Sequence, residues 1–344
     1  MGAAVGLGMM TKYTMAFLLA GIVGGILLTN PRSLLNRWLW YGATVALVIF
    51  LPNLIWQVRH DFITLTFLKF IHVRDVGLGQ TDGFLLAQFW STTNLVTVPL
   101  WIAGLYFLFF RPEGKRYRMI GWMYVIPLAL FFIARGKPYY IGPAYPMLLG
   151  VGAVWGERWV ETLSPTAAAT IRRALRTSLV VSGIAGAALI LPLAPPGSRW
   201  WRIADAVNGN FNEEFGWREM ADAVVRVRNS LAPDDAPIGV LAGDAGQAAA
   251  INLYGRGRSL PEVISGSNSH WLHGYGNPPP KTVVTAGFLR ADLEPVFESC
   301  ELAGQFTIPY GIENIAIGNR TDIFVCRRPR QPWHLLWKRF HWFG

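Results

Sequence analysis

Cationic and phenolic side chains are concentrated in residues 135–146, between two long apolar runs. The segment reads Arg-Gly-Lys-Pro-Tyr-Tyr-Ile-Gly-Pro-Ala-Tyr-Pro. Arginine and lysine form strong charge-assisted hydrogen bonds with phosphate. Polar backbone broken by proline is tolerated at the edge of a bilayer only where protein or a water-filled cavity covers it. We therefore predict that this loop binds a lipid-linked phosphate through Arg135, Lys137, Tyr139, Tyr140 and Tyr145; the alternative is a solvated turn with interfacial tyrosines.

A second polar stretch, residues 57–82, carries both signs of charge. Arg59 and His60 are predicted to join the phosphate site. If an acceptor hydroxyl attacks the donor, a general base must remove its proton. Asp61 and Asp75 are the candidates for that base, although Asp61 beside Arg59 is equally well explained as a local ion pair.

The elements around these residues have the composition of a membrane protein. Hydrophobic residues make up 52% of the 344 residues, charged residues only 15%, and the mean hydropathy is +0.31. Many basic residues fall in short loops between apolar runs, where they orient membrane helices. The net charge of +10 therefore does not indicate a nucleic-acid partner.

The hydropathy pattern predicts about six spans in a transmembrane domain of residues 1–195. The apolar runs are 3–29, 39–55, 83–110, 119–134, 141–160 and 178–193. Loops rich in arginine and lysine alternate with loops of mixed charge. The chain after Pro195 is therefore expected outside the cytoplasm, in the periplasm of a Gram-negative cell, with the spans in the inner membrane.

The remaining sequence predicts a small soluble α/β domain over residues 196–328. Short apolar strands are expected at 237–242, 282–285 and 322–326, with helices at 217–231 and 246–253. Residues 329–344 form a basic aromatic tail. Its apolar residues, spaced as on one face of a helix, predict an interfacial amphipathic helix. They are Trp333, Leu336, Trp337 and Phe340.

Motifs of soluble enzymes are absent from the sequence, which has no P-loop, no His-Glu-x-x-His and no Cys-x-x-Cys. We predict no metal site and no certain cofactor beyond the donor substrate. The Gly-Asp-Ala-Gly-Gln segment 243–247 is interpreted as a turn, with a phosphate or acid site as the alternative. Cys300 and Cys326 are compatible either with one disulfide, if this part lies outside the cytoplasm, or with two unpaired thiols.

Three ordered segments resemble family 39 of the GT-C glycosyltransferases, which includes bacterial relatives of protein O-mannosyltransferases and the lipid A aminoarabinose transferase. They are Gly-Met-Met-Thr-Lys-Tyr at 8–13, Pro-Asn-Leu-Ile-Trp-Gln-Val-Arg-His-Asp-Phe at 52–62 and residues 136–146. The resemblance implies a multi-pass inner-membrane enzyme. Such an enzyme would move a sugar, with inversion, from a polyprenyl-phosphate donor to a periplasmic lipid, glycan or protein, and residues 137–145 would lie near the donor phosphate.

The chain departs from this family at the acidic pair. The resemblance implies an Asp followed by Glu in the first outer loop, and no such pair occurs in residues 1–30. The chain also opens within an apolar segment. We therefore expect the C-terminal portion of such an enzyme, inactive by itself. The alternative is a non-enzymatic membrane protein, either part of a transporter or an anchored binding domain.

Overall fold

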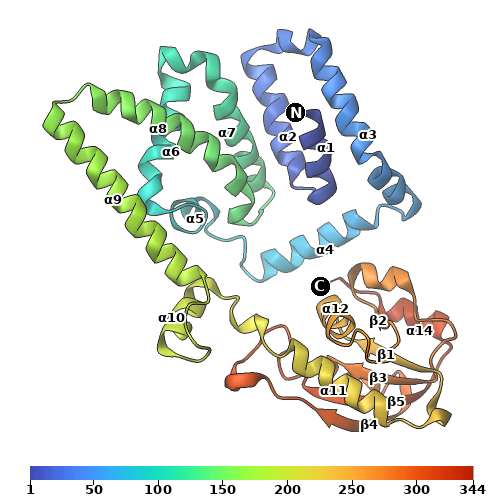
Figure 1. The fold of residues 1–344 in the computed structure, drawn as a ribbon. Helices are drawn as coiled ribbons and strands as arrows, with labels where there is room; N and C mark the ends of the chain where they lie inside the picture. The colour runs from blue at the N-terminus through green and yellow to red at the C-terminus, as the bar shows by residue number, and fades with distance from the viewer. Residues whose placement is uncertain (344) are drawn as a thin grey trace. The chain divides into compact units, whose positions relative to one another are not determined.

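The computed structural model describes residues 1–343 and forms two compact units, Met1–Ala185 and the chain from Gly186 onward (Figure 1). The boundary lies within a long helix, α9, and before the predicted boundary at Pro195. The first unit is helical and the second contains a mixed sheet, so a helical part followed by a small α/β part is confirmed.

The first unit is built from nine α-helices among its residues, joined by short 3-10 turns. Their bounds are α1 Gly2–Thr11, α2 Met15–Thr29, α3 Arg37–Arg59, α4 Ile63–Gly77, α5 Phe84–Trp90, α6 Val98–Phe110, α7 Arg118–Ile133, α8 Tyr145–Glu161 and α9 Pro165–Ile190. Helix α4 occupies the stretch predicted as a polar connection. The 3-10 turn η4, Pro138–Ala144, lies within the cationic loop.

Three helix pairs make the main contacts of this unit, α1 with α3, α2 with α7 and α6 with α8. Glycines permit the closest of these approaches. A β-carbon placed on Gly152 of α8 would overlap the carbonyl oxygen of Leu100 in α6, and one on Gly104 would overlap that of Leu148. Small residues at such crossings are typical of helices packed within membranes.

The outward surfaces of several helices are strongly apolar. Three helices are long and apolar enough to cross a membrane, and a fourth span results if α5 and α6, bent by 92°, are counted together. The apolar windows of α3 and α9 contain no buried residue. Because water would disfavour so much exposed apolar surface, a membrane is the environment that this unit fits. The count of six spans stays a prediction.

The second unit contains a five-stranded sheet in the order β2-β1-β3-β5-β4. Strand β1 is parallel to β2 and β3, whereas β5 is antiparallel to β3 and β4. The strands are β1 Ile238–Ala242, β2 Val263–Ser265, β3 Thr282–Ala286, β4 Phe297–Gln305 and β5 Asp322–Pro329. The helices are α10 Arg199–Asn208, α11 Trp217–Ser230, α12 Ala245–Tyr254, α13 Arg290–Leu293 and α14 Trp333–Phe340.

Side chains alternate between the two faces of the sheet along each strand, and each face is covered by a separate core. Val240 and Val284 point into a core shared with α11 and α12, whereas Leu241 and Val283 point into a second core that includes Trp333 and Trp337 of α14. The strands at 238–242, 282–286 and 322–329 and the helices α11 and α12 match the predicted elements. Strands β2 and β4 were not predicted.

The aromatic face of the C-terminal tail is buried in the second core. Trp333, Leu336 and Trp337 are each at most 6% exposed. The indoles of Trp271 and Trp337 each donate a hydrogen bond to the backbone carbonyl of the other residue. The aromatic face that was predicted to lie at a membrane interface thus packs against the sheet. Whether the basic side of the tail touches a membrane stays a prediction.

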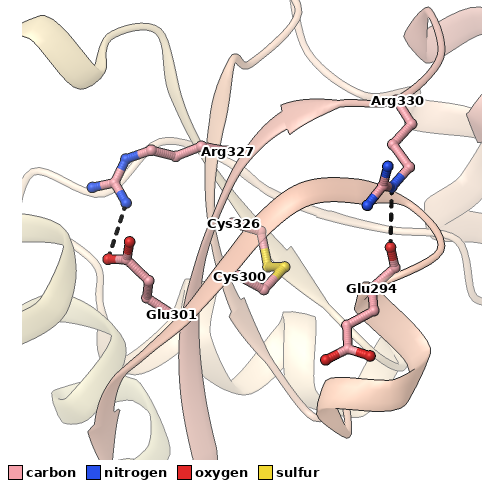
Figure 2. The surroundings of a disulfide bond; sticks show 6 residues. All are labelled: Glu294, Cys300, Glu301, Cys326, Arg327 and Arg330. Atoms are coloured by element: carbon pink, nitrogen blue, oxygen red, sulfur yellow. Dashed lines mark hydrogen bonds and ion pairs between the residues drawn. A yellow bond between two sulfur atoms is a disulfide. The ribbon is translucent and has the colours of Figure 1, made fainter.

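Cys300 of β4 and Cys326 of β5 form a disulfide, which selects between the two possibilities left open by the sequence (Figure 2). The two residues lie directly opposite each other in the antiparallel pair. The bond ties an edge strand to the sheet. Arg327, next to Cys326, pairs with Asp235 at 2.8 Å and with Glu301 at 3.4 Å.

Candidate anion-binding site at the loop 135–146

A buried carboxylate organises the cations of this loop. Lys137 Nζ lies 3.0 Å from Oδ2 of Asp75, and Arg74 Nη2 lies 3.2 Å from Oδ1 of the same side chain. Asp75 is 4% exposed, although it belongs to α4 on the surface of the unit. One carboxylate therefore neutralises only one of the two cations, and the group keeps a net positive charge.

Lys12 approaches the same loop from the end of α1. Its Nζ lies 4.8 Å from the ring centroid of Tyr140 and 5.7 Å from that of Tyr139. Lys12 is exposed and has no acidic partner within residues 1–343. We call Lys12, Arg74 and Lys137 the cation cluster.

Tyr145 is buried and belongs to a hydrogen-bond network that fixes the loop. It is 3% exposed, and its hydroxyl donates a hydrogen bond of 2.9 Å to Oε1 of Gln88 and lies 3.0 Å from the hydroxyl of Tyr124. The Gln88 amide donates to the carbonyl oxygens of Phe84 and Pro138. Tyr145 was predicted to bind substrate. The structure places its hydroxyl inside this buried network, where it holds the loop against α5.

Tyr139 and Tyr140 occupy the outer side of the loop. Tyr139 is 54% exposed and Tyr140 is half-buried, and their rings meet edge to face at 4.9 Å. Their hydroxyl groups are therefore the phenols of this loop that a ligand can reach.

The remaining predicted ligands lie apart from the cation cluster. Arg135 is exposed and pairs with Asp82 at 3.6 Å. The His60 ring stacks on Trp56, and its Nδ1 lies 2.8 Å from the carbonyl oxygen of that residue. Arg59 is exposed at the end of α3. Across residues 1–343, no hydrogen bond or ion pair joins Arg59 or His60 to the loop.

The two candidate bases differ in availability. Asp75 is 4% exposed and each of its oxygens contacts a cation, Lys137 or Arg74, which disfavours it as the base for an acceptor hydroxyl. Asp61 is exposed in a left-handed turn, with φ of 51°, and the local ion pair with Arg59 is not formed. Asp61 is thus the candidate with a free carboxylate.

Sequence reasoning missed the contributions of Lys12 and Gln88, neither of which was predicted to belong to the site. A signal for Lys12 was present, because Thr-Lys-Tyr at 11–13 interrupts an apolar run. Gln88 gave a weaker signal as a polar residue within the apolar stretch 84–90.

The glycine turn of the second unit is structural. The Asp244 carboxylate caps α12 by accepting a hydrogen bond from the backbone N–H of Gln247, and the backbone N–H of Asp244 donates one to Oε1 of Gln247. This reciprocal capping box satisfies the helix end. The segment 243–247, interpreted as a turn, thus contains the N-cap and the first three residues of α12. Among residues 1–343, no group of three or more His, Cys, Asp or Glu side chains could hold a metal ion.

Comparison with known proteins gives a class of protein to which part of this chain is similar. Residues 1–56, which include Lys12, match the family model described as dolichyl-phosphate-mannose-protein mannosyltransferase. The resemblance to GT-C glycosyltransferases is therefore confirmed.

A curated protein of similar sequence also belongs to the glycosyltransferases. Lipid A galacturonosyltransferase RgtD of Rhizobium johnstonii is 29% identical over 203 residues, which are 56% of this chain and 40% of the relative. The aligned region thus spans less than half of the relative's length. No solved structure matches the chain.

Proposed function

We propose that this chain is part of an enzyme that transfers a sugar, with inversion, from a polyprenyl-phosphate donor to an acceptor on the outer face of the inner membrane. The observation that carries the proposal is the cation cluster. The three cations come from separate elements: Arg74 and Lys137 share one buried carboxylate, and Lys12 lies over the ring of Tyr140. The resemblance to glycosyltransferases supplies the reaction class.

Physical chemistry explains why the cluster suits a lipid-linked phosphate. Cations at the edge of a bilayer are costly unless they have a partner, and a phosphate anion is a partner at that depth. Asp75 holds Lys137 in place before the ligand arrives, which lowers the cost of ordering that side chain. The hydroxyls of Tyr139 and Tyr140 add donors, and the exposed apolar helices suit an isoprenoid chain.

The acceptor hydroxyl still requires a base. Asp61 is the candidate in this chain, because Asp75 is engaged by two cations. Residues 1–30 lack the acidic pair that the resemblance implies. We therefore keep the proposal that this chain transfers no sugar by itself, and transfer by the purified chain that disappears in Asp61→Asn would overturn it.

The disulfide supports an oxidising location for the second unit. Structural disulfides form and persist outside the cytoplasm, and Cys300 is bonded to Cys326. We place this unit in the periplasm, where it would meet the acceptor. The alternative of a transporter part or an anchored binding domain is disfavoured, because the matched family model and the matched relative are both named as transferases.

The test is to measure the binding of undecaprenyl phosphate to the full chain, reconstituted in lipid nanodiscs, by isothermal titration calorimetry. Lys12→Gln removes an exposed cation without unpairing an acid. We expect donor affinity to fall roughly tenfold or more, the loss of one charge-assisted hydrogen bond. Lys115→Gln, an exposed lysine of the loop between α6 and α7, is the matched control and should bind as the unsubstituted chain does. Equal affinity of both variants would refute the site.

A further inference from the structure

Helix α10 carries an apolar stripe that is largely exposed. Trp200, Ile203 and Val207 are 43%, 44% and 66% exposed, and their spacing places them on one face of the helix. The opposite face is packed, because Trp201 and Ala204 are buried against Phe211. The exposed stripe is therefore a defined surface of a folded helix.

Local contacts fix the position of this helix. The Ser198 hydroxyl caps its start by accepting a hydrogen bond from the Trp201 amide, and Gly209 ends it with φ of 73°. The Trp201 indole donates to Asn212 Oδ1 at 3.1 Å. Since both ends and one face are held, the stripe does not need to refold to meet a partner.

The stripe continues an apolar surface that begins on α9. The Trp200 indole donates a hydrogen bond of 3.2 Å to the carbonyl oxygen of Ala188, in the last turn of α9. Ile190, Leu191 and Leu193, which lead from α9 toward α10, are 63%, 49% and 65% exposed. Helix α9 is one of the helices long and apolar enough to span a membrane.

Charge on this helix is matched to anionic headgroups. Arg199 and Arg202 are exposed beside the stripe, and neither forms an ion pair with any acid of residues 1–343. The acid of the helix, Asp205, instead accepts hydrogen bonds from the backbone and side chain of Asn212. The exposed side of α10 is therefore apolar and positively charged.

We propose that α10 lies in the headgroup region of the bilayer that α9 leaves, with Trp200, Ile203 and Val207 in the lipid and Arg199 and Arg202 on anionic phosphates. Helices with a large apolar face, tryptophan and flanking arginines bind bilayers in this way. The sequence suggested such a role for the tail 329–344, whose aromatic face is buried. This helix would anchor the second unit at the membrane surface independently of donor binding.

A single introduced thiol can report on this helix, because both native cysteines are in the disulfide. Val207→Cys in the full chain is labelled with a polarity-sensitive fluorophore, and Asn229→Cys, at the exposed end of α11, is the matched control. Each protein is reconstituted in nanodiscs of phosphatidylcholine alone or mixed with phosphatidylglycerol. We expect a blue-shifted label at 207, quenched by brominated lipid most strongly in the anionic mixture, and an unquenched label at 229.

Reversing the charge of the two arginines tests how much anionic lipid contributes to the binding of α10. Arg199→Glu with Arg202→Glu, in the labelled protein, should lower the ratio of docked to undocked helix by about fivefold for each arginine. A label at 207 that stays in water in both lipid mixtures would overturn the proposal. Disulfide-linked dimers through Val207→Cys would also overturn it, because a second copy would then cover the stripe. If quenching of the label at 207 is the same in both lipid mixtures and in the charge-reversed variant, recognition of anionic lipid would be overturned.

Discussion

Asp75 is the counter-ion that holds Lys137 in the loop 135–146. The pair is nearly buried, with side-chain exposures of 5% and 18%. Removing the carboxylate charge leaves a desolvated lysine without its counter-ion, which is more costly than losing an exposed pair. This difference leads to a prediction with a close internal control.

We expect Asp75→Asn to destabilise the helical unit by about 3 kcal/mol. Asp82→Asn removes the partner of exposed Arg135 and should change stability by less than about 0.5 kcal/mol. Thermal unfolding in detergent, followed by size-exclusion chromatography after heating, compares the two variants. If both lose stability equally, the buried pair is not what holds the loop.

Asp235 gives a pH-dependent prediction in the second unit. The hydrogen bond from Arg327 holds the pKa of this carboxyl below its ordinary value of 3.8. Because the folded-state pKa is lower, the group stabilises the fold above the unfolded pKa, and this contribution is lost as pH falls through the folded pKa. We expect Asp235→Asn to weaken the loss of stability below about pH 4.

Urea unfolding at a series of pH values, monitored by fluorescence, measures this dependence. Asp234→Asn is the control, since the neighbouring Asp234 is exposed and makes no ion pair within the described chain. An acid limb that is unchanged in Asp235→Asn and altered in Asp234→Asn would contradict the assignment.

The residue types of the candidate site could be read from the sequence, but their partners could not. A loop with Arg135, Lys137 and three tyrosines is recognisable as cationic and phenolic wherever it occurs. The approach of Lys12 depends on the packing of α1 and α2 against the rest of the helical unit. That packing arises from contacts between distant segments, which local composition does not encode.

Helices α10 and α14 show the same limit for whole elements. Both combine tryptophan, aliphatic residues and arginine or lysine at helical spacing. The sheet provides a complementary apolar face for α14, formed in part by Leu241 and Phe324. The stripe on α10 is instead largely exposed. Periodicity therefore predicts the apolar face of a helix and leaves its partner undetermined.

Burial of α14 leads to a prediction about the tail. We expect Trp337→Ala to cost about 3 kcal/mol or more of unfolding free energy, because it empties a core position and unpairs the Trp271 carbonyl. Leu335→Ala, on the exposed side of the same helix, should cost less than about 0.5 kcal/mol. Denaturant unfolding distinguishes the two. A tail bound to the bilayer instead of the sheet would give no large effect for Trp337.

Strands were predicted from the sequence where both of their faces are buried in the fold. Strands β1 and β3 lie inside the sheet, are buried along nearly their whole length and carry no charged residue, as is typical of buried parallel neighbours. Strand β4 is an edge strand with several exposed polar positions, including Glu298 and Glu301. Strand β2 has only three residues. Neither carries enough apolar signal to be distinguished from a loop.

For the molecule as a whole, hydropathy predicts membrane insertion better than it predicts the number of crossings. Helices α3 and α9 are long, apolar and uncovered, so a membrane environment follows from composition alone. The bend of 92° between α5 and α6 is a three-dimensional feature. A single apolar run, 83–110, contains both helices, and a window of hydropathy cannot show whether it crosses once or turns back.

The side of the membrane on which the second unit folds can be tested through its own cysteines. Outside the cytoplasm we expect Cys300 and Cys326 to be oxidised in cells, so a maleimide polymer added after acid quenching should modify neither thiol before reduction and both after it. Alkaline phosphatase fused after residue 344 should be active, because that enzyme needs its own disulfides. Free thiols in quenched cells together with an inactive fusion would place this unit in the cytoplasm. The charge pattern of the loops would then have been assigned the wrong way round, and with it the side on which the donor phosphate meets the acceptor.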